Sequence, residues 1–170
     1  ILVEYPKTAV AKTQPKTMIG LDMSLPNLYV DSNGNTPDFP KPYRKIEPAL
    51  AKEQKRLSRK KKGSKRYEAQ RLKIAKLHAK AKHQRSDFLH KLSASLTDTY
   101  DLIAIEDLDM SDIRRSLKFG KSTSDNGWGM FVEMLTYKAE RKGKQLVKID
   151  RWFPSSKTCC QCGHAHKELT

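Results

Sequence analysis

Residues 18–31, MIGLDMSLPNLYVD, and residues 101–106, DLIAIE, decide the fold of this chain. Each is a short apolar stretch that carries an acid, Asp22 in the first and Glu106 at the end of the second. Residues 18–31 predict two short strands around a turn at residues 24–27. Residues 101–106 have the pattern of a strand buried on both faces, which is typical of the core of an α/β protein.

A third apolar stretch, QLVKID at residues 145–150, follows a helical pattern that begins at Trp128 and stops at Lys142–Gly143. Together with residues 101–106, it gives the order strand, helix, strand. This order predicts a βαβ unit with parallel pairing of its strands. The expected fold class is therefore α/β.

A strongly basic segment lies between the two acid-bearing strands. Residues 41–91 hold 19 Lys or Arg and only 4 acids, and this excess equals the net charge of the whole chain, +15. We expect residues 36–46 to form a loop, followed by a first helix with Pro48 in its first turn and its end near Gly63. Ser64 is then expected to cap a second, longer helix.

The second helix is predicted to have one apolar and one basic face. Ile74, Leu77 and Ala81 follow helical spacing, and a stripe of lysines lies beside them. This stripe and the turn between the helices are the predicted nucleic-acid contacts: Lys73, Lys76, Lys80, Arg59, Lys60, Lys61, Lys62, Lys65 and Arg66. A basic run can also be only a solvated helical face, and this alternative stays open here.

The two acids on apolar strands require an explanation, because a carboxylate is costly to bury unless it is paired or binds a cation. Either Asp22 and Glu106 each reach solvent at a strand end or cap a neighbouring element, or they share a divalent-metal site. Mg²⁺ prefers carboxylate oxygens and keeps water ligands that substrate phosphates can replace. The basic segment nearby favours the metal interpretation. We expect Asp107 and Asp109 to be bystanders, because Asp107 alternates to the opposite face of the strand.

All three cysteines lie between residues 159 and 162, which excludes a disulfide framework and favours a reducing compartment. Cys159 and Cys162 have the spacing of half a zinc site. No second Cys-x-x-Cys follows, so His164 and His166 are the other residues that could complete the site. No apolar run is long enough to span a membrane.

Five blocks occur in a recognisable order: IGLDMS, KKKGSKRYEAQRLKIAKLHAKAKHQRSDFLHKLS, IAIEDL, GWGMFVEML and WFPSSKTCCQCG. In this order they resemble the TnpB family, the OrfB transposases of bacterial and archaeal insertion sequences. The resemblance implies an RNase H-like (RuvC) core with an inserted basic helical hairpin and the start of a zinc ribbon. It further implies an RNA-guided DNA endonuclease of a transposable element, with guide RNA and target DNA as partners.

The family resemblance also assigns roles to individual residues. Asp22 and Glu106 match two RuvC carboxylates, which are catalytic and bind Mg²⁺. Cys159 and Cys162 match half of a Zn²⁺ site. The implied location is the prokaryotic cytoplasm, in association with the nucleoid.

The same resemblance divides the chain into five parts. Residues 1–15 are a trailing strand or linker from an absent N-terminal domain, 16–46 and 101–152 the two parts of the RuvC-like domain, 47–100 the hairpin, and 153–170 an incomplete zinc ribbon. The family's third catalytic Asp and second cysteine pair lie beyond residue 170, so we expect this fragment alone to be inactive. The alternatives are a nucleic-acid-binding fragment or derivative without catalysis, and a general RNA-binding or ribosomal-type protein.

Overall fold

A computed structural model describes residues 14–25, 27–109, 127–151, 158 and 162–164. Its centre is a four-stranded mixed sheet with the strand order β2-β1-β3-β4. The strands are β1 (Met18–Ser24), β2 (Leu28–Asp31), β3 (Leu102–Glu106) and β4 (Gln145–Ile149). β1 pairs with β2 in antiparallel fashion, whereas β1–β3 and β3–β4 are parallel. The predicted α/β class and the parallel βαβ unit are therefore confirmed.

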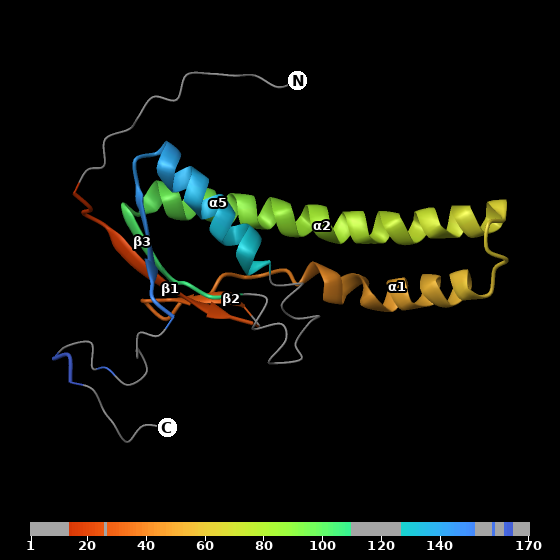
Figure 1. Ribbon diagram of the computed structural model, residues 1–170, viewed down its shortest axis with the longest axis horizontal. Helices are drawn as coiled ribbons and strands as arrows, with labels where there is room; N and C mark the ends of the chain where they lie inside the picture. Colours follow the sequence, from red (N-terminus) through yellow and green to blue (C-terminus); the bar gives the residue numbers. More distant parts are fainter. Residues whose placement is uncertain (1–13, 26, 110–126, 152–157, 159–161, 165–170) are drawn as a thin grey trace.

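The sheet has one face against helices and one that the described helices leave open (Figure 1). Ile103 and Ile105 of β3 are fully buried on the helical side. Their neighbours Leu102, Ala104 and Glu106 on the other side are only half-buried. The prediction that this strand is buried on both faces is thus wrong for the described part of the chain. An apolar run records the tendency to be buried, but other elements decide which face is covered.

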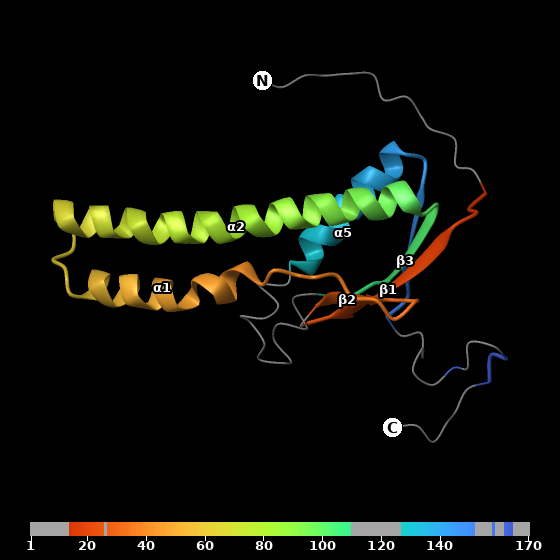
Figure 2. The same ribbon diagram turned by 180° about the vertical axis from the view of Figure 1, so that it is seen from behind.

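Helices α1 (Pro42–Ser58) and α2 (Lys65–Thr99) form an antiparallel hairpin that projects from the sheet (Figures 1 and 2). The Ser64 cap is confirmed, because its hydroxyl accepts a hydrogen bond from the Tyr67 amide at 3.2 Å. Gly63 has a φ of +81° in the turn before it. No helix in the described ranges has both the length and the apolar character needed to cross a membrane.

The first helix differs from expectation at both ends. It begins at Pro42, within the segment expected to be a loop, and Pro48 lies inside it. Proline suits the first turn because its missing N–H has no intrahelical partner there, so Pro42 starts the helix rather than preventing it. The helix ends at Ser58, with Arg59 as its C-cap, and not near Gly63.

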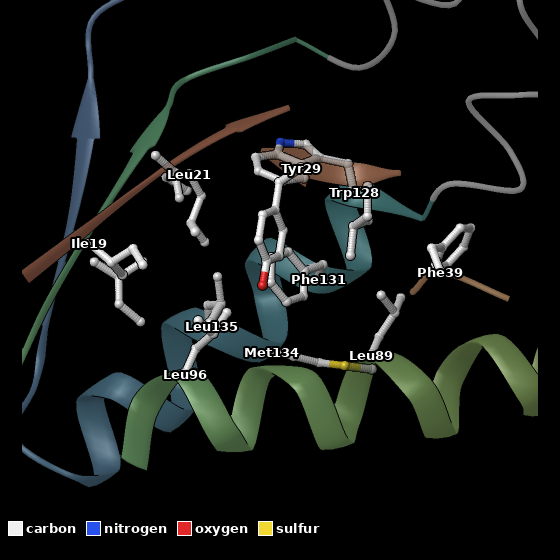
Figure 3. Packing of buried hydrophobic residues seen from close by; sticks show 13 residues of the cluster. Ile19, Leu21, Tyr29, Phe39, Leu89, Leu96, Trp128, Phe131, Met134 and Leu135 are labelled. Atoms are coloured by element: carbon white, nitrogen blue, oxygen red, sulfur yellow. The ribbon is translucent and has the colours of Figure 1, made fainter. Parts of the chain in front are cut away.

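Helix α5 (Trp128–Arg141) fills the space between the sheet and α2, and starts and stops where the sequence predicts. Phe131 is fully buried and stacks on Tyr29 of β2, with ring centroids 5.8 Å apart, and lies 5.7 Å from the Trp128 ring. Figure 3 shows these rings between the sheet and the helices. Burial of each such side chain stabilises the fold by about 1.5–3 kcal/mol.

Two lysines of α5 tie the hairpin to this core. The Lys138 ammonium donates to the His90 carbonyl at 2.6 Å and to the buried Ser93 hydroxyl at 2.8 Å, both on α2. One turn further, Lys142 donates to the buried Thr97 hydroxyl at 2.9 Å. Burial lowers the pKa of Lys138, and the charge of Lys142 lowers it further. The base of the long hairpin is therefore held by directed bonds as well as by apolar packing.

Candidate metal site and basic hairpin

Asp22 and Glu106 lie side by side in the sheet. In the parallel β1–β3 ladder, Leu21 pairs with Ile105, and each acid is the next residue on its strand. Since side chains alternate between faces, both carboxylates lie opposite the buried Leu21 and Ile105, on the open face. The structure thus brings together the two acids that the sequence singled out.

Both acids line one pocket of about 460 Å³. Its lining includes the small residues Gly20 of β1 and Ala104 of β3, which leave room above the sheet. The pocket lies at the carboxyl ends of the parallel strands β3 and β4, the edge at which open α/β sheets bind ligands. The position of the pocket therefore suits a ligand held by Asp22 and Glu106.

Asp101 joins the strands at the end opposite the two acids. Its Oδ2 accepts from the backbone amides of Lys16 at 2.9 Å and Thr17 at 3.1 Å, and its Oδ1 accepts from the Lys144 ammonium at 2.6 Å. The hydrogen bond from Lys144, followed by those from the two amides, holds the pKa of Asp101 well below its usual range. These bonds join the starts of β1, β3 and β4. Five residues beyond Thr17 and Asp101, the same register aligns Asp22 with Glu106.

The donor chemistry of the pocket fits a hard divalent cation. Asp22 is exposed and Glu106 half-buried, so their oxygens stay accessible to an ion that keeps several water ligands. Asp31 also lines the pocket, but its Oδ1 already accepts from the amides of Asn33 and Asn35, both at 2.9 Å. Within the described ranges, no group of three or more His, Cys, Asp or Glu could hold a metal ion.

Two further acids follow the strands. Asp107 forms an ion pair with Lys148 at 3.0 Å, as suits the bystander role expected for it. Asp150 lines the pocket beside Asp22 and Glu106, and the sequence reasoning missed it. The pattern that identified Glu106, an acid that ends an apolar strand, is repeated in QLVKID and would have found Asp150.

The predicted nucleic-acid contacts lie on the hairpin and not at the pocket. Eight of the nine side chains are exposed and Lys60 is half-buried. None of the nine forms an ion pair with a described carboxylate, whereas the neighbouring Arg56 and Arg71 pair with Glu53 and Glu68. Those in the turn lie at the far end of the hairpin, a helix length of about 25 Å from its base (Figure 2). The exposed lysines and arginines therefore form a separate surface.

The predicted zinc ligands are only partly described. Cys162 is exposed and has a free thiol, and His164 is exposed as well. Cys159 and His166 lie outside the described residues. The zinc site therefore stays a prediction.

Comparison with known proteins gives consistent matches. Residues 1–117 match the OrfB_IS605 family model, described as "Probable transposase", and residues 128–170 match the "Cas12f1-like, TNB domain" model. A protein of Streptomyces pristinaespiralis named "Putative RNA-guided DNA endonuclease" is 40% identical over 151 residues, covering 89% of this chain and 38% of the relative. The Escherichia coli K12 protein "Putative RNA-guided DNA endonuclease InsQ" is 30% identical over 167 residues, covering 89% and 41%.

A solved structure shares the fold. A chain of the "Cryo-EM structure of the Cas12f1-sgRNA-target DNA complex" superimposes with a TM-score of 0.56 at 14% identity, covering 95% of this chain and 42% of that one. At this low identity the likeness extends to the fold alone. The present chain spans about two fifths of the length of the proteins it matches.

Proposed function

We propose, from the premise that this chain belongs to the OrfB_IS605 transposase family, that it forms part of a metal-dependent, RNA-guided DNA endonuclease of TnpB type. The family membership confirms the resemblance that the sequence predicted. The names of the relatives and of the solved complex support guide RNA and target DNA as partners. Base pairing between guide RNA and target DNA would supply sequence specificity, while the protein would recognise the backbone and the shape of the resulting duplex.

The observation that carries the proposal is the register of Asp22 and Glu106. Two carboxylates on adjacent parallel strands, on one face and in one pocket, supply two of the acids that the family resemblance implies for a RuvC-like nuclease centre. Their oxygens would hold Mg²⁺, which when bound activates water and neutralises charge on the phosphodiester. The open side of the pocket leaves space for the sugar–phosphate backbone, and the hairpin would hold the nucleic acid that delivers it.

The finer assignments belong to the same proposal. Residues 16–46 and 101–152 would form the RuvC-like domain, 47–100 the inserted hairpin, and 153–170 the start of a zinc ribbon in which Cys159 and Cys162 bind Zn²⁺. Residues 1–15 would be a trailing strand or linker. The Cys-x-x-Cys spacing of Cys159 and Cys162 supports the zinc ribbon. Location in a prokaryotic cytoplasm, at the nucleoid, is part of this interpretation.

A second function is favoured by one observation: the described residues offer two carboxylates in register but no group of three or more metal ligands. The chain alone would then be a nucleic-acid-binding fragment or derivative of the family, without catalysis. Under this alternative, the hairpin keeps its role and the pocket binds a divalent ion weakly or not at all.

Titration with Mn²⁺, used in place of Mg²⁺, tests the pocket. Asp22→Asn and Glu106→Gln should each weaken Mn²⁺ binding about 10–100-fold or more, since even indirect supports of a metal site have effects of that size. Asp107→Asn is the matched control, because Asp107 pairs with Lys148 instead. Equal affinity in all four proteins would contradict the metal site.

Incubation with supercoiled plasmid and Mn²⁺ separates the two functions. Nicking by the wild-type chain that is lost in Asp22→Asn would support an endonuclease. Mn²⁺ binding without nicking would show that this chain alone is a binding fragment, as expected if further residues complete the catalytic centre. Nicking that survives both substitutions would place the catalytic centre elsewhere.

A further inference from the structure

We propose that one face of the hairpin, built from both of its helices, binds the backbone of a double-stranded nucleic acid along the length of the hairpin. This basic face consists of Lys45, Lys52 and Arg56 of α1 with Lys73, Lys76 and Lys80 of α2. The inference rests on the proposed function and deepens it, because it adds α1 to the interface and names the form of the nucleic acid. The basic face is separate from the predicted contacts in the turn at the hairpin end.

The basic residues of α1 form one row and those of α2 form a second row. Helix geometry places these two rows on the same side of the hairpin. α1 and α2 pack against each other through Ile46 and Leu50 on one helix and Gln70 and Ala81 on the other. At 3.6 residues per turn, the basic residues of both helices lie about 70–140° round from these packing positions, in the same rotational sense. Two antiparallel helices are related by a two-fold axis perpendicular to both. Equal rotations therefore bring both rows to one face.

Contacts across the hairpin agree with this placement. On the basic side, Glu53 accepts hydrogen bonds from Gln70 and, at 2.6 Å, from Arg56. The pKa of Glu53 is lowered first by the bond from Gln70, and further by the charges of Arg56 and Lys73. Arg56 and Lys73 come from different helices, so their shared neighbour places them on the same side of the hairpin.

The opposite face of the hairpin is aromatic. Tyr43 of α1 and His78 of α2 stack there, with ring centroids 6.4 Å apart. By the same geometry, they lie on the other side of the helix contact, as do the acids Glu47 and Glu68. Glu53 is thus the one acid of α1, and of α2 as far as Lys80, on the basic face. The hairpin therefore carries an excess of positive charge, and this excess is concentrated on one of its two faces.

The base of the basic face adds a second cationic feature. A pocket of about 480 Å³ at the start of α1 is lined by Lys41, Arg44 and Lys45, with Asp38 and Phe39. Lys45 belongs to both the pocket and the face. The α1 row therefore continues from this pocket over about 16 Å to Arg56, a distance that about five base pairs cover at 3.4 Å each.

The chemistry of the face favours a double helix over a single strand. Packed helices lie about 8–10 Å apart, so the face presents two parallel rows of cations that can meet two phosphate chains. Proteins that grip single strands add aromatic side chains on which bases stack. The stacked rings of Tyr43 and His78 lie on the other side, and His83, three residues after Lys80, is the one described ring that continues the basic row. A surface made mainly of long, flexible lysine and arginine side chains is suited to backbone phosphates.

The test compares two double substitutions that remove the same charge. Lys45→Gln with Lys52→Gln removes two cations of the basic face on α1, while Arg71→Gln with Lys82→Gln removes two exposed cations of α2 that lie on the opposite side of the helix contact. Binding to a DNA duplex of about 15 base pairs, and to one of its strands, is measured over a range of salt concentrations. For the duplex, the face variant should lower the log–log salt slope by about 1.8, since each phosphate contact contributes about 0.9.

The control variant should keep the wild-type slope, and the single strand should respond less than the duplex. Equal loss in the two variants, no loss in either, or a larger loss on the single strand would overturn the inference. Far-UV circular dichroism on heating checks that each variant keeps its helices. None of these substituted residues lines the carboxylate pocket. Mn²⁺ binding therefore tests the proposed function independently of this inference.

Discussion

The sheet pocket and the hairpin hold their charges in opposite ways. Asp22 and Glu106 are fixed by the backbone ladder of β1 and β3, so their separation is set by hydrogen bonds between strands. The lysines of the basic face extend into solvent on flexible side chains, each exposed to water. Metal binding requires fixed geometry, whereas phosphate binding is a sum of similar contributions. A single substitution should therefore disable the pocket, and several are needed to disable the hairpin.

The largest expected effect is on the core that supports the sheet. Phe131→Ala should lower the free energy of unfolding by about 3–5 kcal/mol, because it leaves a cavity between the sheet and α2 where Tyr29 and Trp128 now pack. Urea denaturation followed by tryptophan fluorescence measures this. Leu72→Ala on the hairpin is the control, because Leu72 is 56% exposed and should change stability by about 0.5 kcal/mol or less. Equal losses would remove the distinction between a packed sheet and an extended hairpin.

The second prediction tests whether the contacts of individual hairpin lysines with phosphates contribute additively to nucleic-acid binding. Replacing Lys73, Lys76 and Lys80 together with Gln should lower the log–log salt slope of binding by about 2–3, and each single replacement by about 0.7–0.9. The triple replacement should weaken binding to nucleic acids of unrelated sequence by the same factor, because phosphates carry no sequence information. Salt titrations with RNA and with DNA measure the slopes. An unchanged slope would mean that the stripe is only a solvated face.

The elements that the sequence predicted well are those fixed by local chemistry. The Ser64 cap, the α5 helix and the β3–β4 pairing each depend on residues close in the chain or on a general rule of connection. The register of Asp22 and Glu106 is different, because β1 and β3 are far apart in the chain and hydrogen bonds between distant residues join their starts. The amino-acid sequence alone is therefore enough to predict the elements around the candidate site and to single out its two acids, but not to place the acids side by side.

What could not be predicted depends on context. Pro42 and Pro48 look alike in sequence, yet one begins α1 and the other lies within it, because packing of Ile46 and Leu50 on α2 decides where the helix runs. The open face of β3 depends on which elements cover the sheet. The two basic rows form one face only because α1 packs antiparallel on α2, and the sequence pattern of either helix alone does not predict this packing.

The third prediction concerns acid stability at the strand starts. Because the pKa of Asp101 is held below its ordinary value of 3.8, its ionised form favours the folded state. This contribution is complete above pH 3.8 and is lost progressively as the pH falls below that value. Asp101→Asn should therefore destabilise the protein at pH 7, with the difference from wild type shrinking in acid. Urea unfolding at several pH values measures this difference, and a constant difference would exclude Asp101 as the source.

The smallest expected effect is a gain in affinity for duplex nucleic acid. Glu53 is the acid on the basic face, so Glu53→Gln should tighten duplex binding about two- to fourfold at low salt by removing one repulsive charge next to Arg56 and Lys73. The gain should shrink as salt is added, because screening weakens the repulsion it removes. An amide still accepts the hydrogen bond from Gln70, so the helix contact is kept.

Glu68→Gln is the matched control for this gain, since Glu68 pairs with Arg71 on the side of α2 turned away from the basic face. Both substitutions raise the net charge by one, so only position distinguishes them. If the two gains were equal, the hairpin would act through its total charge, and no face would be preferred. A gain confined to Glu53→Gln would show that the nucleic acid lies along the side where α1 and α2 combine their cations.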